Sequence, residues 1–193
     1  MSSAGRAGGK PAMRFPLWPT GGVLALDLAG VTGWCYGPPE QPLPAGFGEW
    51  ELPLIGGRGA KGAGLQNKLA PFIKRYRPVK LVLESPLPLP AQTHFNSAYQ
   101  QFGLGYLAHA EAWRGRAAVV EVDVHTARRE VMGITRMSRK TIKREVVRFC
   151  WRRGVKVQSD HAADAAVLWW WNRPRTLGIA PAAGPLFQWE DAA

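Results

Sequence analysis

The sequence predicts a single α/β domain built on a five-stranded mixed sheet that is flanked by helices. Its apolar and turn-forming segments follow the order βββαβαβαα, a three-strand antiparallel meander followed by parallel strands reached through helical crossovers. The chain has 193 residues, which suits one domain of ordinary size. Its composition, 46% hydrophobic and 20% charged, is that of a globular protein.

The meander is expected at the start of the domain. VLALDL, residues 23–28, is a continuous apolar run of the kind that forms a central strand. Segments 32–37 and 45–52 are expected to form the next two strands, separated by the turn-rich PPEQPLP. Sequential strands joined by short turns pair antiparallel, so these three segments predict the meander.

Helices and strands alternate in the rest of the domain. The glycine-rich segment IGGRGAKGAG is expected to be a flexible loop, and the later helices are expected to begin at polar caps, Ser138 for the fourth and Asp160 for the last. The expected strands are 80–85 and 117–123, and the expected helices are 65–76, 95–114, 126–132, one following Ser138, and 159–171.

We expect three parts along the chain: a flexible basic leader over 1–20, the folded domain over 21–172, and a Pro- and Ala-rich tail over 173–193. No apolar run reaches the roughly 18 residues that a membrane span needs, and the leader lacks the core of a signal peptide. The two cysteines, Cys35 and Cys150, form no CxxC pattern, which argues against a disulfide scaffold or a cysteine-rich zinc site. A cytoplasmic location and no membrane partner are therefore expected.

The net charge of +11 is concentrated in one segment. Eleven of the 25 Lys and Arg residues and two of the 14 acidic residues lie between positions 128 and 156, so this segment carries +9 of the total. A local positive face predicts a polyanionic partner, most simply nucleic acid. The alternative is an ordinary solvated helix face.

Two carboxylates end apolar strands. Asp27 and Glu84 occupy these positions, and parallel neighbouring strands would bring them together at the edge where open α/β sheets place their sites. His161 and Asp164 lie three residues apart on the expected last helix and so share a face that can point to the same edge. Asp123 also ends a strand and is treated as a decoy. The alternative for each is structural: a strand leaving the core, or a core histidine.

Three carboxylates and one imidazole favour a particular metal. Hard cations prefer oxygen ligands, and Mg²⁺ is usually held by a few carboxylates with waters and phosphate oxygens. A zinc site would need more nitrogen or sulfur ligands. This set therefore suits a two-metal site for phosphodiester chemistry.

Nine tryptophans are an unusual number for this length, and three of them, Trp169 to Trp171, are consecutive. A helix turns by about 100° per residue, so three successive side chains span about 200° and cannot all face one core. We expect one or two to pack on the sheet and the outward one to serve a dimer interface or lie near DNA. Trp113 and Trp151 are expected in the core or at its rim.

These motifs together resemble a known family. D-x-x-G-x-T-G at 27–33, a strand ending in Glu84, HAADA at 161–165 and the basic segment VHTARREVMGITRMSRKTIKREVV look like the RuvC-type Holliday junction resolvases of the ribonuclease H-like superfamily. The resemblance spans about 23–171. It implies a ribonuclease H-like fold and an endodeoxyribonuclease of the crossover junction resolvase type, active as a homodimer on branched DNA in a bacterial or phage-infected cell.

The resemblance also implies roles for individual residues. Asp27 would bridge two Mg²⁺ ions, with Mn²⁺ able to substitute, while Glu84 and Asp164 complete the ligand set. His161 would bind metal or position a water, and Lys140 or Lys143 would lie near the scissile phosphate. The expected DNA-binding residues are Arg128, Arg129, Arg136, Arg139, Lys140, Lys143 and Arg144, together with Phe95 or His94 as the aromatic that stacks at the junction centre.

The sequence departs from the family in two turns. LAGV after Asp27 is one residue shorter than in cellular members, and the loop after Glu84 is longer and proline-rich. These departures point to a phage-type or divergent member. Three other functions stay open: a less selective nuclease for flaps, forks or RNA–DNA hybrids; a non-catalytic nucleic-acid-binding domain; and an ATP-using member of the superfamily, which the absence of a second phosphate loop disfavours.

Overall fold

The computed structural model describes residues 17–86, 95–134 and 137–179. Five strands form one sheet in the order β3-β2-β1-β4-β5. The central strand β1 pairs antiparallel with β2 and parallel with β4; β2 pairs antiparallel with β3, and β4 parallel with β5. The strands are β1 (Val23–Asp27), β2 (Val31–Gly37), β3 (Gly46–Glu51), β4 (Lys80–Glu84) and β5 (Ala118–Val122). The predicted meander and parallel strands are confirmed.

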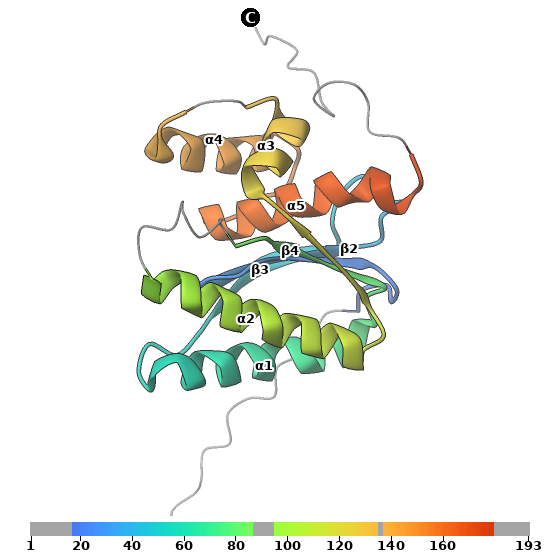
Figure 1. Cartoon of the computed structure of the whole chain (residues 1–193). Coiled ribbons are helices and arrows are strands. Elements are labelled where there is room, and N and C mark those ends of the chain that lie inside the picture. The colour runs from blue at the N-terminus through green and yellow to red at the C-terminus, as the bar shows by residue number, and fades with distance from the viewer. Residues whose placement is uncertain (1–16, 87–94, 135–136, 180–193) are drawn as a thin grey trace, which may run out of the picture.

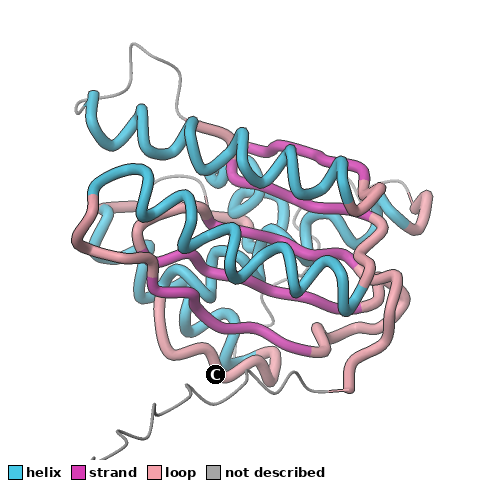
Figure 2. The backbone as a smooth tube through the Cα atoms, turned by 90° about the horizontal axis from the view of Figure 1, so that it is seen from below, coloured by secondary structure: helices cyan, strands magenta, loops and turns pink. Residues whose placement is uncertain are grey.

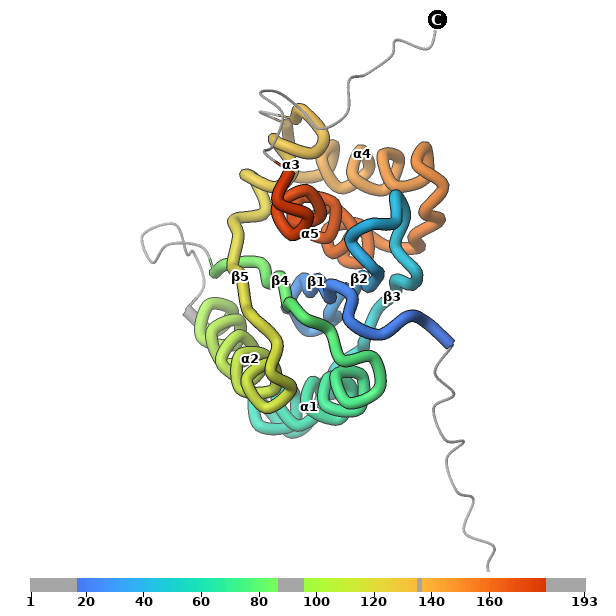
Figure 3. Tube along the Cα trace, turned by 90° about the vertical axis from the view of Figure 1, so that its right-hand side faces the viewer, coloured from blue at the N-terminus to red at the C-terminus, as the bar shows by residue number. Residues whose placement is uncertain are grey.

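Helices cover both faces of this sheet. They are α1 (Gly57–Tyr76), α2 (Phe95–Arg114), α3 (Val124–Met132), α4 (Arg139–Arg152) and α5 (Asp160–Thr176). Helices α1 and α2 lie side by side on one face, and α5 lies on the other (Figures 1 and 2). Seen along the sheet, α3 and α4 form a further layer outside α5, so that α5 lies between them and the strands (Figure 3).

The sheet separates two hydrophobic cores. The side facing α1 and α2 is aromatic: Phe72 is 2% exposed and lies against Tyr36, Trp34 and Tyr76, with ring centroids 4.6–5.7 Å apart. Trp18, inside the predicted leader, also packs there, 5.1 Å from the Tyr76 ring. The side facing α5 is built mainly from small and aliphatic residues and contains the tryptophans of α5.

The loop predicted over 55–64 is wrong, because helix α1 begins at Gly57. Glycine disfavours helix by about 1 kcal/mol per residue relative to alanine, but tertiary contacts can override that cost. Here α2 supplies those contacts: Arg58 donates to Asn96 at 2.8 Å and Lys61 to Gln100 at 2.6 Å. The last helix also continues to Thr176, beyond the predicted end at 171.

The three consecutive tryptophans are all buried, with exposed fractions of 0%, 2% and 8%. The prediction that one faces outward is therefore wrong. The expectation assumed one covered face, whereas α5 is covered by the sheet on one side and by α3 and α4 on the other (Figure 3). The expectation for Trp113, a place in the core or at its rim, is wrong, because this side chain is 82% exposed on α2.

None of the described helices combines the length and the apolar composition that a bilayer crossing requires.

Candidate active site

Asp27 and Glu84 lie next to each other at one edge of the sheet. Strands β1 and β4 run parallel with Leu26 opposite Leu83, and each carboxylate is the next residue along its strand. Asp123 belongs to a different arrangement: its side chain accepts a hydrogen bond from the Thr126 N–H at 2.9 Å and caps α3. Asp123 is therefore a helix cap, and Asp27 and Glu84 form the pair of neighbouring carboxylates at the strand ends.

The first turn of α5 rests directly on β2. A Cβ atom added to Gly33 would lie 2.0 Å from the carbonyl oxygen of His161, so only glycine allows this approach. The helix is capped by Ser159, whose hydroxyl accepts from the Ala162 N–H at 3.2 Å. The last glycine of the D-x-x-G-x-T-G motif thus brings α5 to the strand ends. The predicted cap Asp160 is wrong, because that residue is helical and pairs with Lys143.

His161 and Asp164 point to the strand ends, but each is already engaged. Nδ1 of His161 lies 2.7 Å from Oδ2 of Asp27. Asp164 accepts two hydrogen bonds from Arg128 of α3, from Nε to Oδ1 at 2.9 Å and from Nη2 to Oδ2 at 2.6 Å. Asp164 is 7% exposed and Arg128 8%, so this fork-to-carboxylate pair is buried.

The electrostatics of the cluster follow from burial and like charge. Burial, followed by the neighbouring Asp27 and Asp164 carboxylates, raises the pKa of Glu84 to about 9. Burial also raises the pKa of Asp164 to about 6, although Arg128 opposes that shift. The hydrogen bond to Asp27 raises the pKa of His161. Glu84 and Asp164 thus lack enough positive charge near them to stay ionised over the usual pH range of a carboxylate.

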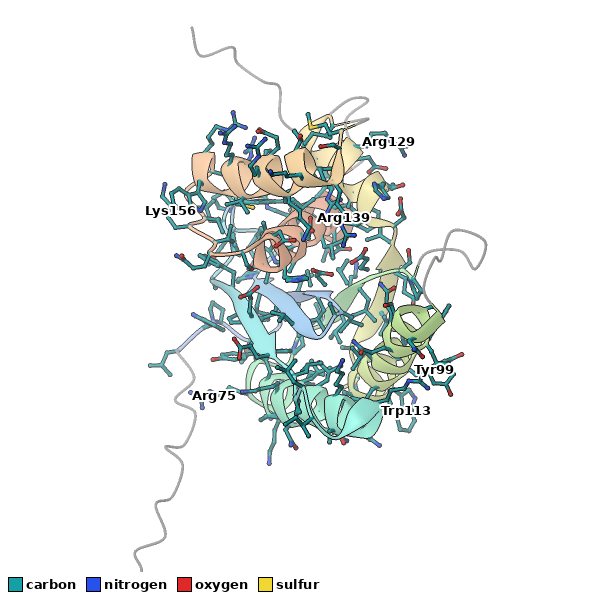
Figure 4. The ribbon with its side chains drawn as sticks, turned by 90° about the vertical axis from the view of Figure 1, so that its left-hand side faces the viewer. Arg75, Tyr99, Trp113, Arg129, Arg139 and Lys156 are labelled. Carbon is teal, nitrogen blue, oxygen red and sulfur yellow. The ribbon has the colours of Figure 1, made fainter. Side chains whose placement is uncertain are left out.

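A cleft of about 470 Å³ opens over Asp27 and Glu84. One wall is the turn after β1, and the other is a polar face at the start of α2, with Arg139 from α4 closing the rim. Figure 4 looks onto this end of the molecule, with Arg139 between α4 and the strand edge. Sequence reasoning missed the residues that α2 contributes, although their spacing marks one polar helical face: Asn96, Ser97, Gln100 and Gln101.

The basic residues divide into two groups. Arg129, Arg139, Lys140 and Arg144 are exposed on α3 and α4. Lys143 is half-buried and paired with Asp160, and Arg128 is buried behind the cleft. The remaining expected contacts, Arg136, His94 and the side chain of Phe95, lie outside the described residues.

Within the described ranges, no three His, Cys, Asp or Glu side chains stand in an arrangement that could hold a metal ion directly. The types of residue fit a hard divalent cation, since Asp27, Glu84 and Asp164 supply oxygen donors. Both oxygens of Asp164 are engaged by Arg128.

The sheet order, the helical layers and a carboxylate cluster at the C-terminal ends of β1 and β4 define a ribonuclease H-like fold. The comparisons with solved structures identify its particular form. RuvC of Thermus thermophilus is similar with a TM-score of 0.61 at 12% identity, covering 81% of this chain and 96% of that chain. The same protein in complex with a Holliday junction substrate gives a TM-score of 0.62 at 10% identity, with coverage of 82% and 96%.

The yeast mitochondrial Holliday junction resolvase Ydc2 is also similar, with a TM-score of 0.53 at 15% identity over 84% of this chain and 82% of that chain. The predicted resemblance to RuvC-type resolvases is therefore confirmed for the fold. No protein-family model and no curated protein matches the sequence.

Proposed function

We propose that this chain is a metal-dependent, structure-selective DNA endonuclease that cleaves branched DNA such as four-way junctions. The observation that carries the proposal is the meeting of Asp27, Glu84 and Asp164 from three separate elements at one edge of a RuvC-type fold. Such convergence of buried carboxylates is costly without a cation to balance it. Structural neighbours that are Holliday junction resolvases support the substrate class.

The three carboxylates, with His161 beside them, are the residues that would hold divalent ions, Mg²⁺ or Mn²⁺. Bound ions would stabilise the charge that develops on a phosphodiester during attack by water. Glu84, whose pKa is raised to about 9, would lose its proton as the ions enter. His161 is positioned by Asp27 and would in turn fix the orientation of that carboxylate.

The rim of the cleft would bind the nucleic acid. Arg139 lines the cleft, and Lys140 and Arg144 continue along the exposed side of α4. Guanidinium and ammonium groups bind phosphate oxygens, while the neutral polar face of α2 offers donors without further charge. A DNA strand would therefore pass between α2 and α4, with one phosphate over Asp27 and Glu84.

Helix α2 offers a surface for a second copy of the chain, and we propose a homodimer there. One of its faces carries four exposed aromatic side chains: Tyr99 at 53%, Phe102 at 39%, Tyr106 at 77% and Trp113 at 82%. The guanidinium of Arg58 from α1 lies over the Tyr99 ring, 4.4 Å from its centroid. Their spacing keeps them on a single stripe, and Figure 4 shows Tyr99 and Trp113 on the outer side of α2. Such a patch suits a protein partner. A two-fold axis through this stripe would relate the clefts of the two chains, so that the dimer could make paired cuts in a four-way junction.

The decisive experiment incubates the protein with a synthetic four-way junction, a flap, an RNA–DNA hybrid and a linear duplex, with and without Mg²⁺. We expect metal-dependent cuts in the junction and little cleavage of the duplex. Equal cutting of flap or hybrid would favour the less selective nuclease, and no cutting of any substrate would contradict an enzyme.

The matched pair of variants for this assay is Asp27→Asn and Asp123→Asn. Asp27 is the last residue of β1 and Asp123 directly follows β5, but only Asp27 lies in the cleft, and an asparagine at 123 can still cap α3. We expect the first variant to lose about 10³-fold in cleavage while binding junction DNA normally, and the second to cut at the wild-type rate.

A further inference from the structure

Arg128 differs in burial from the basic residues that are its neighbours along the chain. Its neighbour Arg129 is exposed, whereas Arg128 is 8% exposed and donates two hydrogen bonds to Asp164. A guanidinium that donates to both oxygens of a carboxylate fixes the geometry of the pair more closely than a single hydrogen bond does. The pair fixes the position of Asp164 while it uses both of its oxygens.

Asp164 itself is set back from the cleft. Asp27 and Glu84 line the cleft, but Asp164 is not among the described residues that do so. This agrees with the finding that no three acidic, His or Cys side chains within the described ranges are set to hold a metal. The cleft thus presents two carboxylates, and the third is held by an internal cation.

Charge balance indicates how many divalent ions this arrangement accommodates. When all three carboxylates are ionised, they and Arg128 carry a formal charge of −2, and Arg139 at the rim of the cleft reduces it to −1, so a single divalent ion is enough to balance the cluster. A second divalent ion beside Asp164 would be repelled by the guanidinium that shares the same carboxylate. The arrangement therefore suits about one ion, although the proposed chemistry uses two.

From this we propose that Arg128 stands in for the second metal ion. In the protein without DNA, Arg128 holds Asp164, so that only the site at Asp27 and Glu84 accepts a divalent ion. When DNA brings a phosphate group into the cleft, the Arg128 guanidinium would withdraw from Asp164, and Asp164 would then be free to hold a second ion. Arg128 is thus a positioning residue that couples full metal loading to the presence of substrate. This inference rests on the proposed function.

The test counts the Mn²⁺ ions bound per chain in the absence of DNA, by electron paramagnetic resonance of unbound Mn²⁺ and by titration calorimetry. We expect about one ion for the wild type and about two for Arg128→Gln. Arg148→Gln is the matched control, because Arg148 also pairs with a carboxylate, Glu145 at 2.8 Å, but on the exposed side of α4. It should bind Mn²⁺ as the wild type does.

A second variant serves if Arg128→Gln fails to fold. Asp164→Asn should leave Mn²⁺ affinity without DNA within about threefold of the wild type, because Asp164 is held by Arg128 in that state. Loss of a true ligand would weaken affinity by about tenfold or more. With junction DNA carrying a non-cleavable phosphorothioate linkage, the wild type should bind about two ions and Asp164→Asn about one.

Two results would overturn the inference while the proposed function stands: a wild type that binds two ions without DNA, or an Asp164→Asn variant that loses tenfold in affinity without DNA. If the wild type binds no Mn²⁺ with or without DNA and cuts nothing, the proposed function itself fails, and the role of Arg128 fails with it.

Discussion

The two ends of α5 differ in their electrostatic surroundings and in how well their polar groups are paired. At its first turn, His161 and Asp164 join Asp27 and Glu84 in a cluster where burial and like charge raise the pKa values of Glu84 and Asp164. At its far end, the three tryptophans are buried, and each indole N–H has an acceptor: Gly37 O at 3.2 Å, Pro42 O at 3.2 Å and Glu130 Oε2 at 2.9 Å. The first turn therefore lies among like charges that raise pKa values, whereas all three indole N–H groups at the far end have hydrogen-bond acceptors.

This difference shows how the fold supports an unfavourable site. Buried carboxylates in mutual contact destabilise the folded state, and they persist only where the surrounding structure holds them in place. The tryptophan end of α5 packs against the sheet, α3 and α4 and supplies that support. Substitutions at the two ends should therefore affect different properties: stability at the tryptophan end and cleavage at the cleft end.

The largest effect on stability is expected for Trp169→Ala. Trp169 has no exposed surface, and removal of a buried tryptophan costs about 3–5 kcal/mol. Urea unfolding should show this loss, while cleavage per folded molecule stays near the wild-type rate. Leu54→Ala is the control, because Leu54 is 89% exposed in the segment between β3 and α1, and it should change the free energy of unfolding by less than about 0.5 kcal/mol. A large loss of cleavage in folded Trp169→Ala would show that the two ends are not separable.

The contact between β2 and the first turn of α5 allows a test of the cleft end of the helix, where a substitution should affect cleavage. Gly33→Ala places a Cβ atom 2.0 Å from the His161 carbonyl, so the first turn of α5 must move away from the strand ends. A displacement of about 1 Å at a reacting centre costs on the order of 10²-fold in rate. Junction cleavage should fall by at least that factor while junction binding persists.

Gly103→Ala is the control for the added methyl group, because a Cβ at Gly103 meets no atom within 4 Å. It should leave cleavage unchanged and stabilise α2 slightly, by up to about 1 kcal/mol. If Gly33→Ala cuts as fast as the wild type, the position of α5 does not control the site.

The strained cluster should make stability depend on pH. Glu84, Asp164 and His161 all have raised pKa values, so the folded protein retains protons that the unfolded chain releases. The free energy of unfolding should therefore fall as pH rises from about 5 to 9, by a few kcal/mol in total. Melting temperatures measured across this range would show the slope, and Mg²⁺ should reduce it at the alkaline end.

Glu84→Gln tests which group is responsible. Glutamine keeps the shape but cannot ionise, so the decline between about pH 6 and 9 should become markedly smaller. Asp123→Asn should keep the wild-type slope. If the free energy of unfolding depends on pH in Glu84→Gln as it does in the wild type, the ionisation of Glu84 is not the cause of that dependence.

Sequence reasoning predicted the parts of this molecule that depend on local pattern. The strands ending in Asp27 and Glu84 and the helix carrying His161 and Asp164 are in the expected places, because alternation and spacing are local properties. The burial of all three tryptophans was missed, because it depends on which elements cover α5. Arg128 was assigned to the basic surface for a similar reason: nothing in its neighbourhood along the chain indicates Asp164, 36 residues away.

The smallest expected effect concerns the basic side of α4. Arg144→Gln removes one exposed charge beside the cleft rim, and loss of a single phosphate contact should weaken junction binding severalfold. The slope of log K against log salt concentration should decrease by about one. Arg75→Gln is the matched control, because Arg75 is an exposed arginine on α1, on the opposite layer of the molecule (Figure 4). If both variants change the slope equally, binding depends on net charge alone. If only Arg144→Gln does, the DNA lies along α4, and the cleft end of α5 faces it.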